Sequence, residues 1–155
     1  MKWILYLLLT AILFVIPVER TDVGKLEPVE LLWLHRNRDV LVLETDIGNV
    51  GRGIDTMQAV EDLHDAAAGI LYLDTAEYLL IAPDCMDEIG EMERYLRGNV
   101  RMCVAEDCPD AVLAAEYLDI HHPKTEIENY NGEQIGEKLV IRDGQYHLEA
   151  ENEKK

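Results

Sequence analysis

Positively charged residues are scarce in this sequence. Of its 155 residues, 14 are Lys or Arg and 31 are Asp or Glu, which gives a formal net charge of −17 at pH 7. A surface of that sign repels nucleic acids and anionic lipid headgroups. We therefore expect no nucleic acid among the partners of this protein. The acidity leaves basic partners and divalent cations open, and a metal-binding or cation-buffering protein is one hypothesis.

Cysteine is also sparse, since Cys85, Cys103 and Cys108 are the complete set and form no CxxC pair. Three thiols exclude a dense disulfide scaffold, although one bridge from Cys85 to either of the others is possible. A zinc site built from Cys103, Cys108 and His121 can be imagined, but the C-x4-C spacing is loose. The simpler interpretation of Cys103, in its apolar run, is a small buried hydrophobic residue. We expect no metal and no cofactor.

Two widespread catalytic signatures are missing. The sequence contains no G-x-S-x-G motif. Its glycine-rich stretch GNVGRG lacks the Lys-Ser/Thr pair of a P-loop and the full G-x-G-x-x-G spacing of a dinucleotide site. We interpret Gly48, Gly51 and Gly53 as turn residues.

One stretch, GILYLDTAEYLLIAPD, carries a near match to the active-site loop of an aspartic protease. Such an enzyme needs two carboxylates that share a proton, each on a loop whose third residue is normally glycine. Here Ala76 replaces that glycine and only one such triplet exists, so a homodimer would have to supply the second aspartate. The alternative is that Asp74 and Thr75 end a strand and hydrogen-bond to backbone.

These two interpretations of Asp74 predict different surroundings. An enzyme should show a concave pocket in which polar side chains converge on Asp74 or on Cys103. An adaptor should show Asp74 bonded to its own turn and a flat apolar patch elsewhere.

The N-terminal segment, residues 1–20, is the most hydrophobic part of the chain. Lys2 precedes an apolar or neutral run of 16 residues from Trp3 to Val18, which as a helix would reach roughly 24 Å. The run predicts a signal peptide or a short signal anchor. Because the small-x-small cleavage pattern is missing, we favour an anchor that inserts residues 3–18 into the cell membrane. Lys2 as the leading charge places the rest of this single-pass protein outside the cytoplasm.

Patterns along residues 21–122 predict one extracytoplasmic α/β domain. Two β-rich runs separated by the turn residues 36–39 indicate a hairpin, and Asp55 followed by Gln58 indicates a capped helix. The full β-β-α-β-α-β-α order is typical of an α/β or α+β fold, with a mixed sheet and about three helices. Residues 123–155 form a polar C-terminal extension, in which Asp143-Gly144 predicts a hairpin over residues 138–148.

Several stretches resemble, in order and spacing, the N-terminal domain of the Ger(x)C proteins, the C subunits of spore germinant receptors. The matching positions are Lys25-Leu26, Gly51 with Gly53, Ala59 with Leu63, and Leu96-Arg97. The resemblance covers roughly residues 19–118 and rests on an apolar pattern without a diagnostic signature. Family members are lipoproteins with two further domains, whereas this signal segment ends without a cysteine and the chain is too short to hold those domains. The resemblance implies a non-enzymatic extracytoplasmic subunit of an endospore-forming bacterium and no catalytic residue.

Taken together, the patterns favour a non-enzymatic, membrane-anchored interaction or assembly domain that docks onto a membrane or envelope partner. An accessory protein of sporulation or germination is one such role. The expected contact region is the end of the sheet around Asp74, Thr75 and Tyr78, joined by Trp33 if its side of the hairpin is exposed. The alternative is a small exported hydrolase, of aspartic type at Asp74 or metal-dependent through Cys103 and His121.

Overall fold

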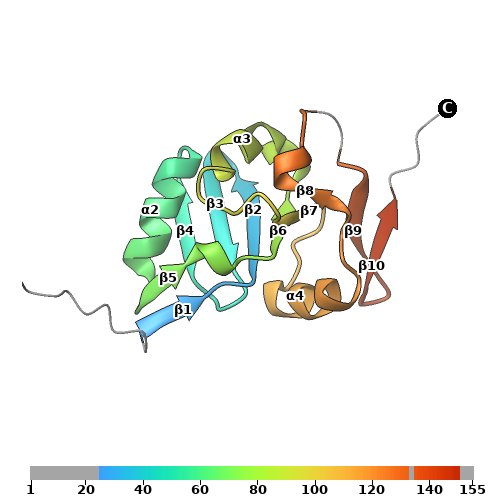
Figure 1. The fold of residues 1–155 in the computed structure, drawn as a ribbon, viewed down its shortest axis with the longest axis horizontal. Coiled ribbons are helices and arrows are strands. Elements are labelled where there is room, and N and C mark those ends of the chain that lie inside the picture. The colour runs from blue at the N-terminus through green and yellow to red at the C-terminus, as the bar shows by residue number, and fades with distance from the viewer. Residues whose placement is uncertain (1–24, 133–134, 151–155) are drawn as a thin grey trace, which may run out of the picture.

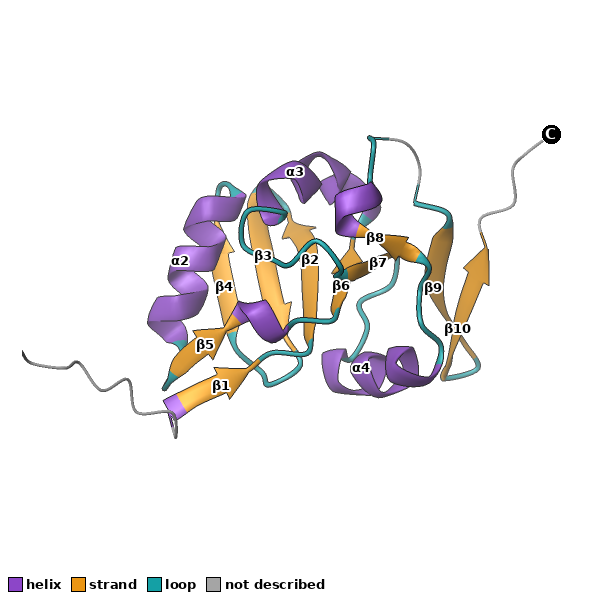
Figure 2. Cartoon of the chain, in the orientation of Figure 1, coloured by secondary structure: helices purple, strands orange, loops and turns teal. Residues whose placement is uncertain are grey.

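The computed structural model describes residues 25–132 and 135–150. Figures 1 and 2 show a large twisted sheet, with helix α2 (Thr56–Ala66) beside one of its edges and helix α4 (Ala111–Ile120) below its centre. The predicted membrane anchor, residues 1–20, lies outside the described residues. Among the helices that are described, none has the length and apolar character needed to cross a bilayer.

Strands and short helices alternate along the chain. Their bounds are β1 (Leu26–Pro28), β2 (Leu31–Asn37), β3 (Val40–Thr45), β4 (Val50–Gly53), α2 (Thr56–Ala66), β5 (Ile70–Tyr72), η2 (Leu73–Thr75), β6 (Tyr78–Ile81), η3 (Pro83–Glu88), α3 (Ile89–Met92), β7 (Arg101–Ala105), α4 (Ala111–Ile120), β8 (Thr125–Glu126), η4 (Ile127–Asn129), β9 (Glu137–Arg142) and β10 (Gln145–Ala150), where η denotes a 3-10 helix.

The large sheet has the strand order β10-β9-β7-β6-β2-β3-β4, and β8 pairs with β7 beside that path. Strands β2, β6, β7 and β9 are parallel neighbours, whereas β3, β4 and β10 run antiparallel to theirs. A separate parallel pair joins β1 to β5. The described residues thus form a mixed sheet with three α-helices, which confirms the predicted α/β fold class.

The core is centred on β6. All four of its residues are buried, and it lies between the parallel strands β2 and β7. A parallel strand covered on both faces carries a continuous apolar run rather than an alternating one, because each side chain meets other protein atoms. The sequence YLLI of β6 follows this rule.

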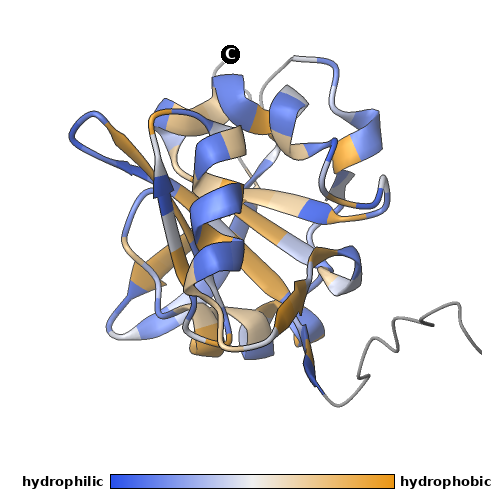
Figure 3. Ribbon diagram, turned by 90° about the vertical axis from the view of Figure 1, so that its left-hand side faces the viewer, coloured by the Kyte–Doolittle hydropathy of each residue, from blue (hydrophilic) through white to orange (hydrophobic). Residues whose placement is uncertain are grey.

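Helix α2 begins at the predicted cap. The Asp55 carboxylate accepts a hydrogen bond from the backbone N–H of Gln58 at 2.9 Å, which satisfies one free donor of the first turn. The helix buries Ala59, Val60 and Leu63. Figure 3, which views the molecule from the side of α2, shows hydrophilic residues along the outward face of this helix.

Two glycines have a role different from the predicted one. Gly48 is a turn residue, with φ of +87°. Gly51 and Gly53 lie within β4, however, and α2 packs directly on them. A Cβ atom at either position would collide with the backbone of Ala59. These two glycines therefore let the helix approach the sheet closely, and their interpretation as turn residues is corrected.

The predicted C-terminal hairpin forms, and it belongs to the main sheet. Its turn residues Asp143 and Gly144 have φ of 52° and 75°, as a two-residue hairpin turn requires. Strand β9 pairs in parallel with β7. Two tyrosine hydroxyls tie β10 to the start and the middle of α4: Tyr117 accepts from the backbone N–H of Leu148 at 3.0 Å, and Tyr146 accepts from that of Asp110 at 3.0 Å.

Candidate functional site

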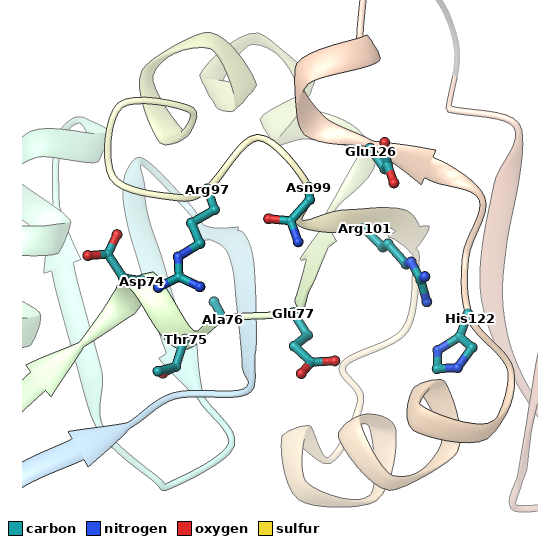
Figure 4. Close-up of a pocket in the computed structure, with 9 residues that line it drawn as sticks. All are labelled: Asp74, Thr75, Ala76, Glu77, Arg97, Asn99, Arg101, His122 and Glu126. Carbon is teal, nitrogen blue, oxygen red and sulfur yellow. The ribbon is translucent and has the colours of Figure 1, made fainter.

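A polar pocket of about 340 Å³ opens at the amino ends of the neighbouring parallel strands β6 and β7 (Figure 4). Most of the side chains that line it are charged. They are Asp74, Thr75, Ala76, Glu77, Arg97, Asn99, Arg101, His122 and Glu126. We call this site the β6–β7 pocket.

One wall of the β6–β7 pocket is the η2 turn, which Thr75 holds in place. The Thr75 hydroxyl accepts a hydrogen bond from the backbone N–H of Val29 at 3.0 Å and donates to the carbonyl of Tyr72 at 2.7 Å. Leu73, in the same turn, is buried in the core. The predicted backbone bonding is therefore confirmed for Thr75.

Asp74 behaves differently from its neighbour. It is exposed, and Figure 4 shows its carboxylate at the edge of the pocket, on the same side as Arg97. Thr75, and not Asp74, makes the side-chain hydrogen bonds of the η2 turn among the described residues. The adaptor expectation that Asp74 bonds to its own turn is thus not met, because the Thr75 hydroxyl makes these bonds instead.

Another part of the lining comes from the connection between α3 and β7, whose backbone is fixed at several points. Residues 97–100 form a turn closed by a 3.1 Å hydrogen bond from the N–H of Val100 to the carbonyl of Arg97. The N–H of Ile127 donates to the carbonyl of Val100 at 2.8 Å, and that of Arg101 to the carbonyl of Glu77 at 2.9 Å. Both arginines of the pocket therefore project from a backbone held by neighbouring elements.

The charges in the pocket are mixed and largely unpaired. Arg97 and Arg101 line the pocket together with the three carboxylates of Asp74, Glu77 and Glu126. No ion pair joins either guanidinium to a carboxylate of the described residues, although Arg101 and Glu126 are direct cross-strand partners. The planar fork of each guanidinium is thus available to an external acceptor.

His122 forms the third basic position and is held by Tyr78. The Tyr78 hydroxyl lies 2.8 Å from Nδ1 of His122, and the two rings stack at a centroid distance of 6.3 Å. Burial raises the pKa of the Tyr78 hydroxyl, and the charges of Glu77 and Asp119 raise it further. The hydroxyl therefore keeps its proton and can donate a hydrogen bond to Nδ1, an arrangement in which Nε2 carries the ring proton and is itself a hydrogen-bond donor.

Of the residues predicted to form the contact region, three belong to this site. Asp74 and Thr75 line the pocket, and Tyr78 supports its wall from behind through His122. Trp33 does not take part. It is 2 % exposed and stacks on His35 at a centroid distance of 5.2 Å, so the exposure on which its inclusion depended is absent.

The residues of the hypothetical metal site are occupied elsewhere. Cys103 is buried in β7, and all three cysteines are free thiols, so the possible bridge from Cys85 is not formed. His121 packs against Tyr117 with tilted rings at a centroid distance of 4.5 Å. Within the described part of the chain, no three His, Cys, Asp or Glu side chains are grouped so that they could hold a metal ion.

Sequence reasoning missed the basic side of the pocket. Arg97, Arg101 and His122 lie 23 or more positions after Asp74, and only the parallel pairing of β6 with β7 brings them to one edge. The usable signal was the RGNVR stretch at the start of a strand, where two arginines flank a turn in an otherwise acidic chain.

Comparison with known proteins adds no relative. No protein-family model matches the chain. The curated proteins and the solved structures likewise contain no significant match.

Proposed function

We propose that this protein is a non-enzymatic interaction domain, anchored in the membrane through residues 3–18, that docks onto an envelope or membrane partner outside the cytoplasm. The anchor and its orientation rest on the apolar run and on Lys2. The resemblance to the N-terminal domain of the Ger(x)C proteins implies the same class of role, as an accessory of sporulation or germination.

The observation that carries the proposal is the unpaired state of the pocket arginines. Arg97 and Arg101 stand on a fixed backbone and have no carboxylate partner among the described residues. In a chain with 31 acidic residues, intramolecular partners are abundant. Two guanidinium groups that remain free in a pocket are therefore suited to a group supplied by another molecule.

A small exported hydrolase centred on Asp74 is the second candidate. The observation in its favour is that Asp74 lies in a concave pocket with several polar side chains. Hydrolysis of a fluorescent casein by the full chain, lost in the Asp74→Asn variant, would favour this candidate over the interaction domain. We expect no such hydrolysis.

The location of the domain can be tested through Cys108. This thiol is exposed, whereas Cys85 and Cys103 are buried. A membrane-impermeant maleimide should label the protein in intact cells, and the Cys108→Ser variant should remain unlabelled. Labelling only after the cells are lysed would place the domain in the cytoplasm and overturn the proposal.

Docking through the β6–β7 pocket can be tested by site-specific photocrosslinking in living cells. A photoreactive phenylalanine analogue at Asn99, an exposed residue of the pocket, should give a discrete adduct. The same analogue at Glu61, exposed on the outward side of α2, is the control and should give none. Equal adducts from both positions would argue against the pocket as the contact region.

A further inference from the structure

We propose that the β6–β7 pocket recognises a sugar-sized anion, a phosphate or carboxylate that also carries hydroxyl groups. This inference rests on the proposed function, because it names the chemical group of a partner or an envelope component that the same pocket would bind. Three properties of the pocket support it: its basic groups, its acidic groups and its size.

The basic groups provide the contacts for the anion. In the view of Figure 4, Arg97 lies on one side of the pocket and Arg101 with His122 on the other, with Glu77 between them. Arginine binds carboxylates and phosphates through two parallel N–H donors, and such charge-assisted bonds are about twice as strong as neutral ones. A ligand between these walls meets a guanidinium from whichever side its anionic group points.

The acidic groups explain why a bare anion is a poor fit. Three carboxylates line the pocket together with the two arginines, so a simple inorganic anion would meet like charge as well as opposite charge. Carboxylates accept hydrogen bonds and cannot donate them. A ligand with hydroxyl groups converts Asp74, Glu77 and Glu126 from repelling groups into acceptors.

The size of the pocket limits the ligand. A volume of about 340 Å³ lies at the small end of the range for ligand pockets, which is roughly 300–1,000 Å³. A single sugar ring with one anionic substituent fits this volume. The Asn99 amide, which can both donate and accept, adds a neutral contact on the pocket rim.

The test uses five probes: the sugar anions glucuronate and glucose 6-phosphate, neutral glucose, cationic glucosamine, and inorganic phosphate. The full-length, 15N-labelled chain in an uncharged detergent is titrated with each probe, and the Nε–H signals of Arg97 and Arg101 are followed by NMR. We expect both sugar anions to shift these signals, with an affinity about 10-fold or more above that for inorganic phosphate. Glucose should cause no shift.

Variants separate binding at the site from general attraction between charges. Arg101→Gln and Arg97→Gln should each weaken glucuronate binding about 10-fold or more, because each loses a charged hydrogen-bond donor. Arg94→Gln is the matched control: it removes the same charge from the same stretch of chain, but Arg94 is paired with Glu91 at 2.7 Å, outside the pocket. Arg101→Lys should bind with intermediate affinity, since it keeps the charge and loses the fork.

Several outcomes would overturn the inference. These are binding of inorganic phosphate as tight as that of the sugar anions, equal loss in the Arg94→Gln control, and preference for the cationic glucosamine over glucuronate. The inference and the proposed function fail separately. If Asn99 still crosslinks to a partner while no probe binds, only the ligand chemistry is wrong; if the probes bind while Cys108 stays inaccessible in intact cells, only the location and docking role are wrong.

Discussion

The two ends of the parallel strands use arginine in opposite ways. At the carboxyl end, Arg36 donates to Glu88 at 2.7 Å and to the carbonyl of Asp84 at 3.3 Å. At the amino end, Arg97 and Arg101 have no carboxylate partner in the described part of the chain. Arginine thus links structural elements at the carboxyl end, which we call the closed end, and is free to bind another molecule at the amino end, which we call the open end.

The closed end is a clamp between three elements. Glu88, in η3, accepts from Arg36 of β2 and also from the hydroxyl of Thr56, the first residue of α2, at 2.7 Å. Thr56 is 1 % exposed, so its hydroxyl has no access to water as an alternative partner. Ligands of open α/β sheets usually bind at the carboxyl ends of the strands. Here Arg36, Glu88 and Thr56 bond to one another at that end, and the β6–β7 pocket lies at the amino end.

The largest expected effect is the difference in reaction rate between Cys85, at the closed end, and an exposed thiol. Cys85 follows β6 within η3, and burial raises its pKa to about 12, with the nearby Asp84 charge adding to the effect. At pH 8, iodoacetamide should therefore modify Cys85 about a thousandfold more slowly than an ordinary exposed thiol. Mass spectrometry should find one fast-reacting cysteine, Cys108, in the native protein and three in denaturant. A second fast thiol in the native state would show that this end opens.

Removal of the clamp carboxylate should cause the largest loss of stability. Glu88→Ala leaves the Thr56 hydroxyl and the Arg36 guanidinium without their acceptor, and we expect a loss of about 2–3 kcal/mol in the free energy of unfolding. Urea denaturation measures this quantity. Asp87→Ala is the control, because Asp87 is 73 % exposed and 3.7 Å from Arg36, and it should cost less than about 0.5 kcal/mol. Similar losses in both variants would contradict the clamp.

A moderate effect is expected at the open end from Tyr78→Phe. The change removes the hydrogen bond to His122 but preserves the buried ring, so we expect a loss of about 1 kcal/mol in the free energy of unfolding. A double-mutant cycle with His122→Ala should give a coupling energy of about the same size. A coupling near zero would show that the hydroxyl and the imidazole do not stabilise each other.

The smallest effect concerns Glu30, which precedes β2 at the open end. Partial burial raises the pKa of its carboxyl group, and the charges of Asp46, Asp119 and Glu77 raise it further. A raised pKa means that the folded state disfavours the ionised carboxylate, so stability is lost as the pH rises through that pKa. Glu30→Gln should therefore raise the free energy of unfolding at pH 7 by less than about 0.5 kcal/mol. Near pH 3.5, where wild-type Glu30 is protonated, the two proteins should be equally stable; a gain at both pH values would assign the effect to something other than charge.

Signals confined to a few neighbouring residues were sufficient to predict several elements. Asp143-Gly144 predicted its hairpin because the turn requires positive φ at both positions, and Asp55 predicted the start of α2 because its carboxylate caps the first turn. The second of the three predicted helices is mostly not an α-helix, because residues 83–88 form a 3-10 helix with Pro83 at its start and only Ile89–Met92 form α3.

The candidate site could be predicted only in part, because it depends on which strands are neighbours. Asp74 and Thr75 were noticed from a local motif, whereas Arg97 and Arg101 reach the same pocket through the pairing of β6 with β7. Trp33 was misplaced for a related reason. A strand between two neighbours can be covered on both faces, and the sequence of β2 alone does not tell which of its residues remain accessible.

The hydroxyl of Thr75 has a mechanical consequence for the pocket. It joins η2 to Val29, in the short link between β1 and β2, while β1 is itself paired with β5 immediately before η2. A pull on the first described strand is therefore resisted at two points next to Asp74. A force applied to β1 would therefore be transmitted first to β5 and η2, and η2 forms one wall of the β6–β7 pocket.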